Sequence, residues 1–141
     1  MIEKNESAII AIQETFLAND FTVKIKVYNS CYKQGNFSRR YHGVVATYVH
    51  ESIPTERLII ASQYQVVAMR VNIRKNLTIT IANIYLPGSA NFERGEMCRI
   101  INSLPNPKNI VGDFNAHNTV WGNECTDRGK AYWRRSSCNK A

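Results

Sequence analysis

Four residues with oxygen or amide side chains follow short apolar runs, and their types suit one chemistry. Glu14 follows the run Ala8–Ile12, Tyr85 closes a long alternating segment, and Asp113 and Asn115 follow Ile110-Val111. Side chains at strand ends meet in loops where a rigid sheet aims them at one crevice. Mg²⁺ takes oxygen ligands from one or two carboxylates, water and phosphate. The set therefore indicates a hard-metal site, although a lone glutamate after a strand is more often simply solvated.

The elements that must position these residues are mostly strands. Residues 8–12 form a continuous apolar run typical of a buried strand, with a helix over 3–17 as the competing interpretation. Residues 43–50 predict a second strand, and the alternation in 66–73 and 77–86, joined by 74–76, predicts a hairpin. Helical spacing in 92–104 precedes Pro105, and 109–111 predicts a brief strand entering the Gly112-Asp113 turn. With no repeat or linker, residues 1–141 predict a single α/β (α+β) domain.

Charge gives a first indication of a partner. The chain of 141 residues carries 18 Lys and Arg against 11 Asp and Glu, a formal net charge of +7. Segments 21–50 and 128–141 each hold five basic residues and no acidic ones. Such segments suit a polyanion, most commonly nucleic acid, and a solvated basic surface is the alternative.

Several classes of protein are excluded by composition. No apolar run approaches the ~20 residues that cross a bilayer, so no membrane association is predicted. The first twenty residues carry three glutamates and no basic segment, so they do not resemble a secretion signal. We therefore expect an intracellular protein that is not secreted, with its four scattered cysteines as free thiols and no obligate protein partner.

Three motifs carry a family resemblance: IQET at 12–15, ANIYLPGS at 82–89 and GDFNAHNTVWGNECTDRGKA at 112–131. The chain resembles the endonuclease domain of non-LTR (LINE-type, jockey-like) retrotransposons, within the endonuclease/exonuclease/phosphatase superfamily. The resemblance implies a four-layered, DNase I-like α/β sandwich, partial here. It also implies a nuclear location, DNA as substrate, Mg²⁺ or Mn²⁺ as cofactor, and a reverse transcriptase domain on the same chain of the full-length element.

The resemblance implies roles only at matching positions. Glu14 matches the metal-binding residue, Tyr85 the tyrosine that hydrogen-bonds the scissile phosphate, and Asp113 the residue that activates the attacking water. Asn115 matches the residue that positions the phosphate oxygens. Nucleic-acid contacts are predicted less specifically at Arg39, Arg40, His117 and Arg128. For His117, packing or hydrogen bonding at the edge of the site is the favoured interpretation. For Trp121, a buried loop anchor is favoured over stacking on a base.

Departures from the family pattern lower the expected activity. An Asn-rich strand motif that precedes QET in the family is absent, and so is the later Ser-Asp-His motif. Residues 132–141 diverge from the pattern and are expected to form a divergent or disordered tail. Removing members of a cooperating catalytic set costs orders of magnitude in rate. We therefore expect a weak or inactive endonuclease; the alternative is a catalytically dead relic that retains only non-specific nucleic-acid binding.

Overall fold

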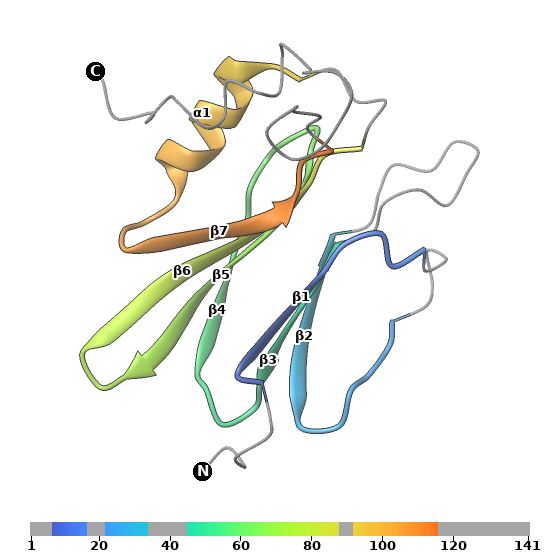
Figure 1. Ribbon diagram of the computed structural model, residues 1–141. Helices are drawn as coiled ribbons and strands as arrows, with labels where there is room; N and C mark the ends of the chain where they lie inside the picture. Colours follow the sequence, from blue (N-terminus) through green and yellow to red (C-terminus); the bar gives the residue numbers. More distant parts are fainter. Residues whose placement is uncertain (1–6, 17–21, 34–44, 88–91, 116–141) are drawn as a thin grey trace, which may run out of the picture.

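Two β-sheets and one helix make up the described part of the protein, which a computed structural model gives for residues 7–16, 22–33, 45–87 and 92–115 (Figure 1). The first sheet is antiparallel with the order β1-β3-β2, from β1 (Ile9–Ile12), β2 (Tyr28–Lys33) and β3 (Val45–His50). The second has the order β4-β5-β6-β7, from β4 (Thr55–Leu58), β5 (Gln65–Arg74), β6 (Leu77–Tyr85) and β7 (Lys108–Asp113). The helix is α1 (Arg94–Ser103).

The apolar patterns of the sequence locate most of these elements. The run at 8–12 is the strand β1 and not a helix, because it pairs along its whole length with β3. The alternating segments form the antiparallel hairpin β5–β6, with a register shift between Asn72 and Arg74. The predicted helix and the strand before the Gly112-Asp113 turn are present as α1 and β7. These expectations are confirmed.

Two strands, β2 and β4, are absent from the expectations. Only Cys31 is buried in β2, and none of the four residues of β4 is. Both strands lie at the edge of their sheet, where half of the backbone groups and many side chains face solvent. An edge strand of polar residues lacks the apolar alternation from which a strand is recognised.

The main core lies between the two sheets. Alternate residues of β5 and β6 face the first sheet, as the two-residue period of a strand requires. They pack against buried side chains of β2 and β3. The buried members of this cluster are Cys31, Val45, Val49, Val67, Met69, Val71, Ile81 and Tyr85. Tyr85 is thus anchored in the core through its ring, at the end of β6.

The helix α1 covers the opposite face of the second sheet (Figure 1). Met97 and Ile100 are fully buried against Val66 and Ile84, and Leu104 packs against alanines of β5 and β6. The described residues therefore form two packed sheets, with α1 on the outer face of the second sheet. The fourth layer of the expected sandwich, a helical cover on the first sheet, is not established and stays a prediction.

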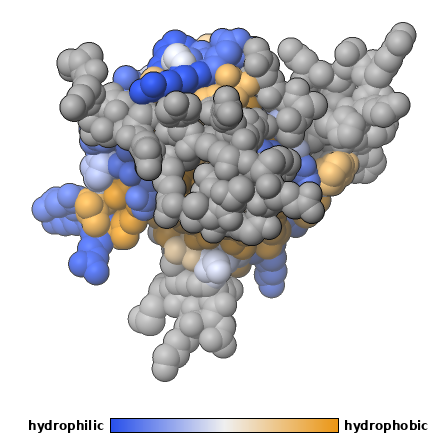
Figure 2. All heavy atoms as spheres, turned by 45° about the horizontal axis from the view of Figure 1, so that its top comes forward, coloured by the Kyte–Doolittle hydropathy of each residue, from blue (hydrophilic) through white to orange (hydrophobic). Residues whose placement is uncertain are grey.

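Exposed apolar side chains are scattered over the described surface. Figure 2 brings the upper end of Figure 1 forward and shows hydrophobic side chains among hydrophilic ones. The exposed large apolar residues come from several segments, with Ile73 and Leu77 on either side of the β5–β6 turn: Phe16, Val23, Ile59, Ile73, Leu77 and Val111. Isolated exposed apolar residues are normal in folded proteins. None of the described helices is long and apolar enough to cross a membrane.

Candidate active site

The parallel pairing of β6 and β7 brings two of the predicted residues together. In this register Tyr85 is the Cα partner of Asp113, and each is the last residue of its strand. The pairing continues one step further, since the Leu86 N–H donates to the Asp113 carbonyl at 2.8 Å. The connection through α1 is what allows two strands of the same direction to lie side by side. The carboxyl ends of β6 and β7 therefore meet at one edge.

A glycine permits this close approach. Gly112 has φ +154°, and a Cβ atom at this position would lie 1.8 Å from the backbone oxygen of Ile84. No side chain fits there, because the obstacle is the main chain of the neighbouring strand. The close approach of β7 to Ile84 thus explains why the GDFN motif has a glycine before Asp113.

The Asp113 and Asn115 side chains are fixed in a tight turn after β7. The Asn115 N–H donates to Asp113 Oδ1 at 2.8 Å, and Asn115 Nδ2 donates to the Leu86 carbonyl at 3.1 Å. Asn115 adopts the left-handed conformation with φ 44°, which asparagine tolerates better than most residues. The turn ties the segment after β7 back to the segment after β6.

Glu14 reaches the same edge from the other sheet. It follows β1, and its Oε1 accepts a hydrogen bond from the Tyr85 hydroxyl. Glu14 and Phe16 have positive φ values of 50° and 49°. Of the four non-glycine residues with positive φ in the described ranges, Glu14 and Asn115 belong to the site and Phe16 lies two residues after Glu14. Such sparsely populated conformations cluster at functional sites.

Asn83 anchors the segment that carries Glu14, a role that sequence reasoning missed. Its amide is fully buried and donates to the carbonyls of Ile12 at 3.2 Å and Ala46 at 3.0 Å. Its Oδ1 accepts from Gln13 Nε2 at 2.5 Å. Asn83 therefore bonds both β1 and β3 from the facing sheet. The signal was an asparagine inside the apolar strand β6, where a buried amide must find partners.

The environment of Tyr85 keeps its hydroxyl protonated. Burial raises the pKa of Tyr85 well above its usual value, and the hydrogen bond to Glu14 and the charges of Glu14 and Asp113 raise the pKa further. A side-chain hydrogen bond from Asn115 works in the opposite direction. A phenol with a raised pKa stays a hydrogen-bond donor throughout the physiological pH range.

Two buried polar atoms without partners lie in residues next to the site. Thr15 Oγ1 follows Glu14, and Gln65 Oε1 belongs to the Cα partner of Tyr85 in β5. Neither residue stands out in the sequence, where each is one ordinary polar side chain among many. An unpaired buried polar atom costs about 1–3 kcal/mol.

The donor set fits a hard divalent cation that keeps water ligands. The side chains at the edge offer the carboxylates of Glu14 and Asp113 and the amide of Asn115, all through oxygen. The described ranges contain no cluster of three or more His, Cys, Asp or Glu residues that could enclose a metal. Mg²⁺ is commonly held by one or two carboxylates, with water and phosphate completing the shell. The residues fit Mg²⁺ or Mn²⁺ in that manner.

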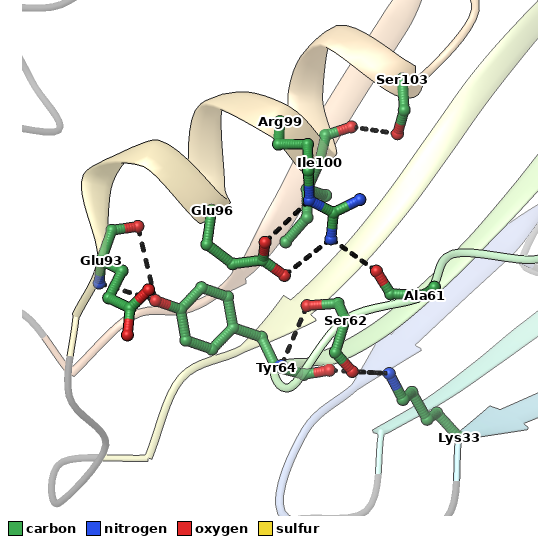
Figure 3. Close-up of polar contacts among 9 residues, drawn as sticks. All are labelled: Lys33, Ala61, Ser62, Tyr64, Glu93, Glu96, Arg99, Ile100 and Ser103. Atoms are coloured by element: carbon green, nitrogen blue, oxygen red, sulfur yellow. Dashed lines mark hydrogen bonds and ion pairs between the residues drawn. The ribbon is translucent and has the colours of Figure 1, made fainter.

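The loop between β4 and β5 flanks the same end of the sheet, because β5 begins beside Tyr85. Figure 3 shows how side chains from β2 and α1 hold it. Lys33 Nζ donates to the carbonyls of Ser62 at 2.8 Å and Tyr64 at 2.9 Å. Arg99 donates to the Ala61 carbonyl at 2.5 Å, and the Tyr64 hydroxyl accepts from the Glu93 N–H at 2.7 Å. The loop is thereby fixed beside the site.

The predicted site residues divide into two groups. Glu14, Tyr85, Asp113 and Asn115 come from three separate segments and lie together at one edge. The predicted nucleic-acid contacts lie outside the described residues: Arg39, Arg40, His117 and Arg128. The same holds for Trp121 and for the predicted tail at 132–141.

Comparison with known proteins supports the expected fold. No protein-family model and no curated protein matches the chain. Among solved structures, the fold is similar to that of the endonuclease domain of TRAS1, a telomere-specific non-LTR retrotransposon, with a TM-score of 0.62 at 18% sequence identity. The similarity covers 91% of this chain and 56% of that chain. The chain thus has the fold of this endonuclease domain over about half of that domain's length.

Proposed function

We propose that this edge is the active site of a metal-dependent DNA endonuclease, which hydrolyses phosphodiester bonds. The observation that carries the proposal is the meeting of Glu14, Tyr85, Asp113 and Asn115, which come from three distant segments of the sequence. The fold similarity to a retrotransposon endonuclease domain supports it. The reaction, the DNA substrate, a reverse transcriptase domain elsewhere in the full-length protein and a nuclear location all belong to this proposal.

Each side chain has a role that suits its chemistry. Glu14 would hold Mg²⁺ or Mn²⁺, and the ion would offset the negative charge that develops on the phosphate and leaving oxygen. Asp113 accepts the proton of the attacking water as a general base. Its neighbour Asn115 bonds back to the strand ends, which keeps the carboxylate in place.

Tyr85 donates a hydrogen bond to a phosphate oxygen. Its raised pKa keeps the proton available for this bond. In the structure the hydroxyl donates to Glu14 instead. Binding of the cation by Glu14 would engage its carboxylate and release the hydroxyl for the phosphate. The bond between Tyr85 and Glu14 would thus be replaced by two others, from Glu14 to the metal and from Tyr85 to the phosphate.

Nicking of supercoiled plasmid by the purified, folded chain in Mg²⁺ tests the proposal. Glu14→Gln and Asp113→Asn remove the charges at the site with little change in volume. Glu51→Gln is the matched control, because Glu51 is an exposed carboxylate in a turn away from this edge. Because two motifs of the resembled family are absent, we expect weak nicking that EDTA abolishes, that both site variants reduce to background, and that the control leaves unchanged.

Other outcomes would contradict the proposal. Equal nicking by the wild type and both site variants would assign the activity to a contaminant. Salt-sensitive DNA binding without metal-dependent nicking would favour the alternative, a non-specific nucleic-acid-binding protein that attracts phosphates through its basic segments.

A further inference from the structure

Glu14 lies on a short segment that receives little restraint from packing. The strand β1 ends at Ile12, and the side chain of Glu14, two residues later, is exposed. Phe16 is 58% exposed. Glu14 has φ 50°, in the left-handed region, which residues other than glycine and asparagine adopt at an energetic cost. The Glu14 carboxylate therefore depends on polar contacts for its position.

Two residues of β6 supply these contacts. Asn83 and Tyr85 are two positions apart, so they face the same way, toward the first sheet. The Tyr85 hydroxyl donates to Glu14 Oε1, and Gln13 Nε2 donates to Asn83 Oδ1 at 2.5 Å. The first bond holds the carboxylate itself. The second bond holds the residue that immediately precedes Glu14.

The amide of Asn83 is a fixed acceptor for Gln13. Asn83 Nδ2 donates to the carbonyls of Ile12 at 3.2 Å and Ala46 at 3.0 Å, which are the last Cα partners of the β1–β3 pairing. The side chain is fully buried. Turning the amide over would place its oxygen against two carbonyl oxygens, so Asn83 Oδ1 stays directed at Gln13.

The bond between Gln13 and Asn83 is compatible with a cation at Glu14, because neither of its two atoms belongs to the donor set of the site. The bond between Tyr85 and Glu14, in contrast, must break when the carboxylate takes up a cation. A protein binds a ligand with an affinity reduced by the fraction of molecules that are in the competent conformation. A contact that restrains Glu14 both before and after binding raises this fraction.

We propose that Gln13, held by Asn83, is a positioning residue for Glu14 and sets the affinity of the site for its divalent cation. This role rests on the proposed function, because it requires Glu14 as a metal ligand. Gln13 acts through the main chain that it shares with Glu14, and not through contact with the cation or the DNA. It therefore affects the affinity for the cation and not the rate at saturating cation.

The test is a titration of the whole chain with Mn²⁺, followed through paramagnetic broadening of the Tyr85 and Leu86 backbone amides. Gln13→Met keeps the length of the side chain and removes its amide. Loss of one hydrogen bond should raise the dissociation constant for Mn²⁺ by about three- to tenfold. This measurement requires no nuclease activity.

Two control variants separate positioning from a general loss of stability. Gln63→Met makes the same substitution at an exposed glutamine between β4 and β5. Arg57→Met removes a different bond between the sheets, since Arg57 Nη2 donates to the Tyr32 carbonyl at 3.0 Å and joins β4 to β2. Both strands lie at the sheet edges away from β1 and β7. Both controls are expected to bind Mn²⁺ as the wild type does.

Two further measurements follow the restraint and its effect. In EDTA, the nuclear Overhauser effect between the Tyr85 ring and the Glu14 side chain should weaken in Gln13→Met and persist in both controls. In the nicking assay, the Mg²⁺ concentration for half-maximal rate should rise by the same factor as the dissociation constant. The rate at saturating Mg²⁺ should stay within about twofold of the wild type.

The possible failures are distinguishable. Equal Mn²⁺ affinity of the wild type and Gln13→Met, with weaker binding by Glu14→Gln, would overturn the role of Gln13 and leave the proposed function standing. A wild type that binds no Mn²⁺ at these amides, or that binds it no better than Glu14→Gln does, would overturn both. A lower saturating rate at unchanged affinity would place Gln13 in the chemical step and also overturn the proposal. Gln13→Ala carries the same expectations if Gln13→Met fails to fold.

Discussion

Gln13 donates a side-chain hydrogen bond to Asn83 at 2.5 Å, and this bond joins the two sheets one residue before Glu14. Asn83 also holds the carbonyls of Ile12 and Ala46. A fully buried amide of the second sheet thus fixes two strands of the first. The position of Glu14 relative to Tyr85 depends on this connection, and not only on apolar packing between the sheets.

Asn83→Leu should therefore destabilise the fold and displace Glu14. Leucine has a similar volume, but it removes the bonds to the carbonyls of Ile12 and Ala46 and takes the acceptor away from Gln13 Nε2. We expect the free energy of unfolding in urea to fall by about 2–4 kcal/mol. Asn109→Ala is the control, since Asn109 is exposed on β7. Equal stability of the two variants would show that Asn83 carries no such connection.

Two glycines should respond oppositely to alanine. Gly112→Ala places a Cβ atom 1.8 Å from the Ile84 backbone oxygen, so β7 must move away from β6, at a cost of several kcal/mol. Gly95 lies in α1, and no atom lies within 4 Å of the position that an added methyl group would take, so Gly95→Ala should stabilise the protein by roughly 0.5–1 kcal/mol. Thermal unfolding of both variants measures the difference. A tolerated Gly112→Ala would contradict the close β6–β7 approach.

Tyr85 should titrate at a higher pH than a tyrosine in water. Its pKa is raised by burial, Glu14 and Asp113, and burial with Tyr32 likewise raises the pKa of Tyr48. The absorbance of tyrosinate should therefore rise in two phases, and Tyr85→Phe should remove part of the later one. A late phase of unchanged amplitude in Tyr85→Phe would assign it to other residues.

The same shift has a consequence for stability. A pKa that is raised in the folded state stabilises the protein fully below the unfolded value, near 10, and this stabilisation is lost as the pH rises further. The wild type should therefore lose stability above about pH 10 more steeply than Tyr85→Phe.

In the nicking assay, Tyr85→Phe is expected to lower the rate by about 100-fold, as loss of one preorganised donor does.

Lys33→Met should loosen the loop between β4 and β5. Lys33 donates to two loop carbonyls, and burial lowers its pKa while Glu96 raises it. Methionine keeps most of the apolar stem but removes both hydrogen bonds, which should cost about 1–3 kcal/mol. Hydrogen exchange at the amides of 62–64 should accelerate relative to Lys75→Met, a change in the exposed β5–β6 turn. Unchanged exchange would mean that Arg99 and Tyr64 hold the loop without Lys33.

The sequence predicted what depends on local pattern. The hairpin β5–β6 alternates because one of its faces is buried, and the α1 residues repeat at helical spacing because they pack on one sheet. The four site residues were found because each ends or follows a strand and matches a motif of the resembled family. Their meeting at one edge is a property of the fold that the motifs implied.

The features that the sequence did not predict depend on partners that are distant along the chain. β2 and β4 are polar edge strands whose partners, β3 and β5, decide their structure. Asn83 and Gln65 are ordinary polar residues in the sequence, and only the facing sheet or the neighbouring strand gives them significance. The buried Nε of Arg70 likewise lacks a hydrogen-bond partner because of how neighbouring strands pack, and no local sequence pattern shows this.

The short edge strand β1 has a consequence for how the protein opens. It has four partly buried residues and, among the described strands, pairs with β3 alone, whereas β5 and β6 are long and paired on both sides. Local opening is easiest where few buried contacts and few hydrogen bonds must break. We expect β1 to detach in a sub-global fluctuation that leaves β5 and β6 intact. Glu14 would leave with it, so the lifetime of the assembled site would be set by the opening of β1 and not by the global stability of the domain.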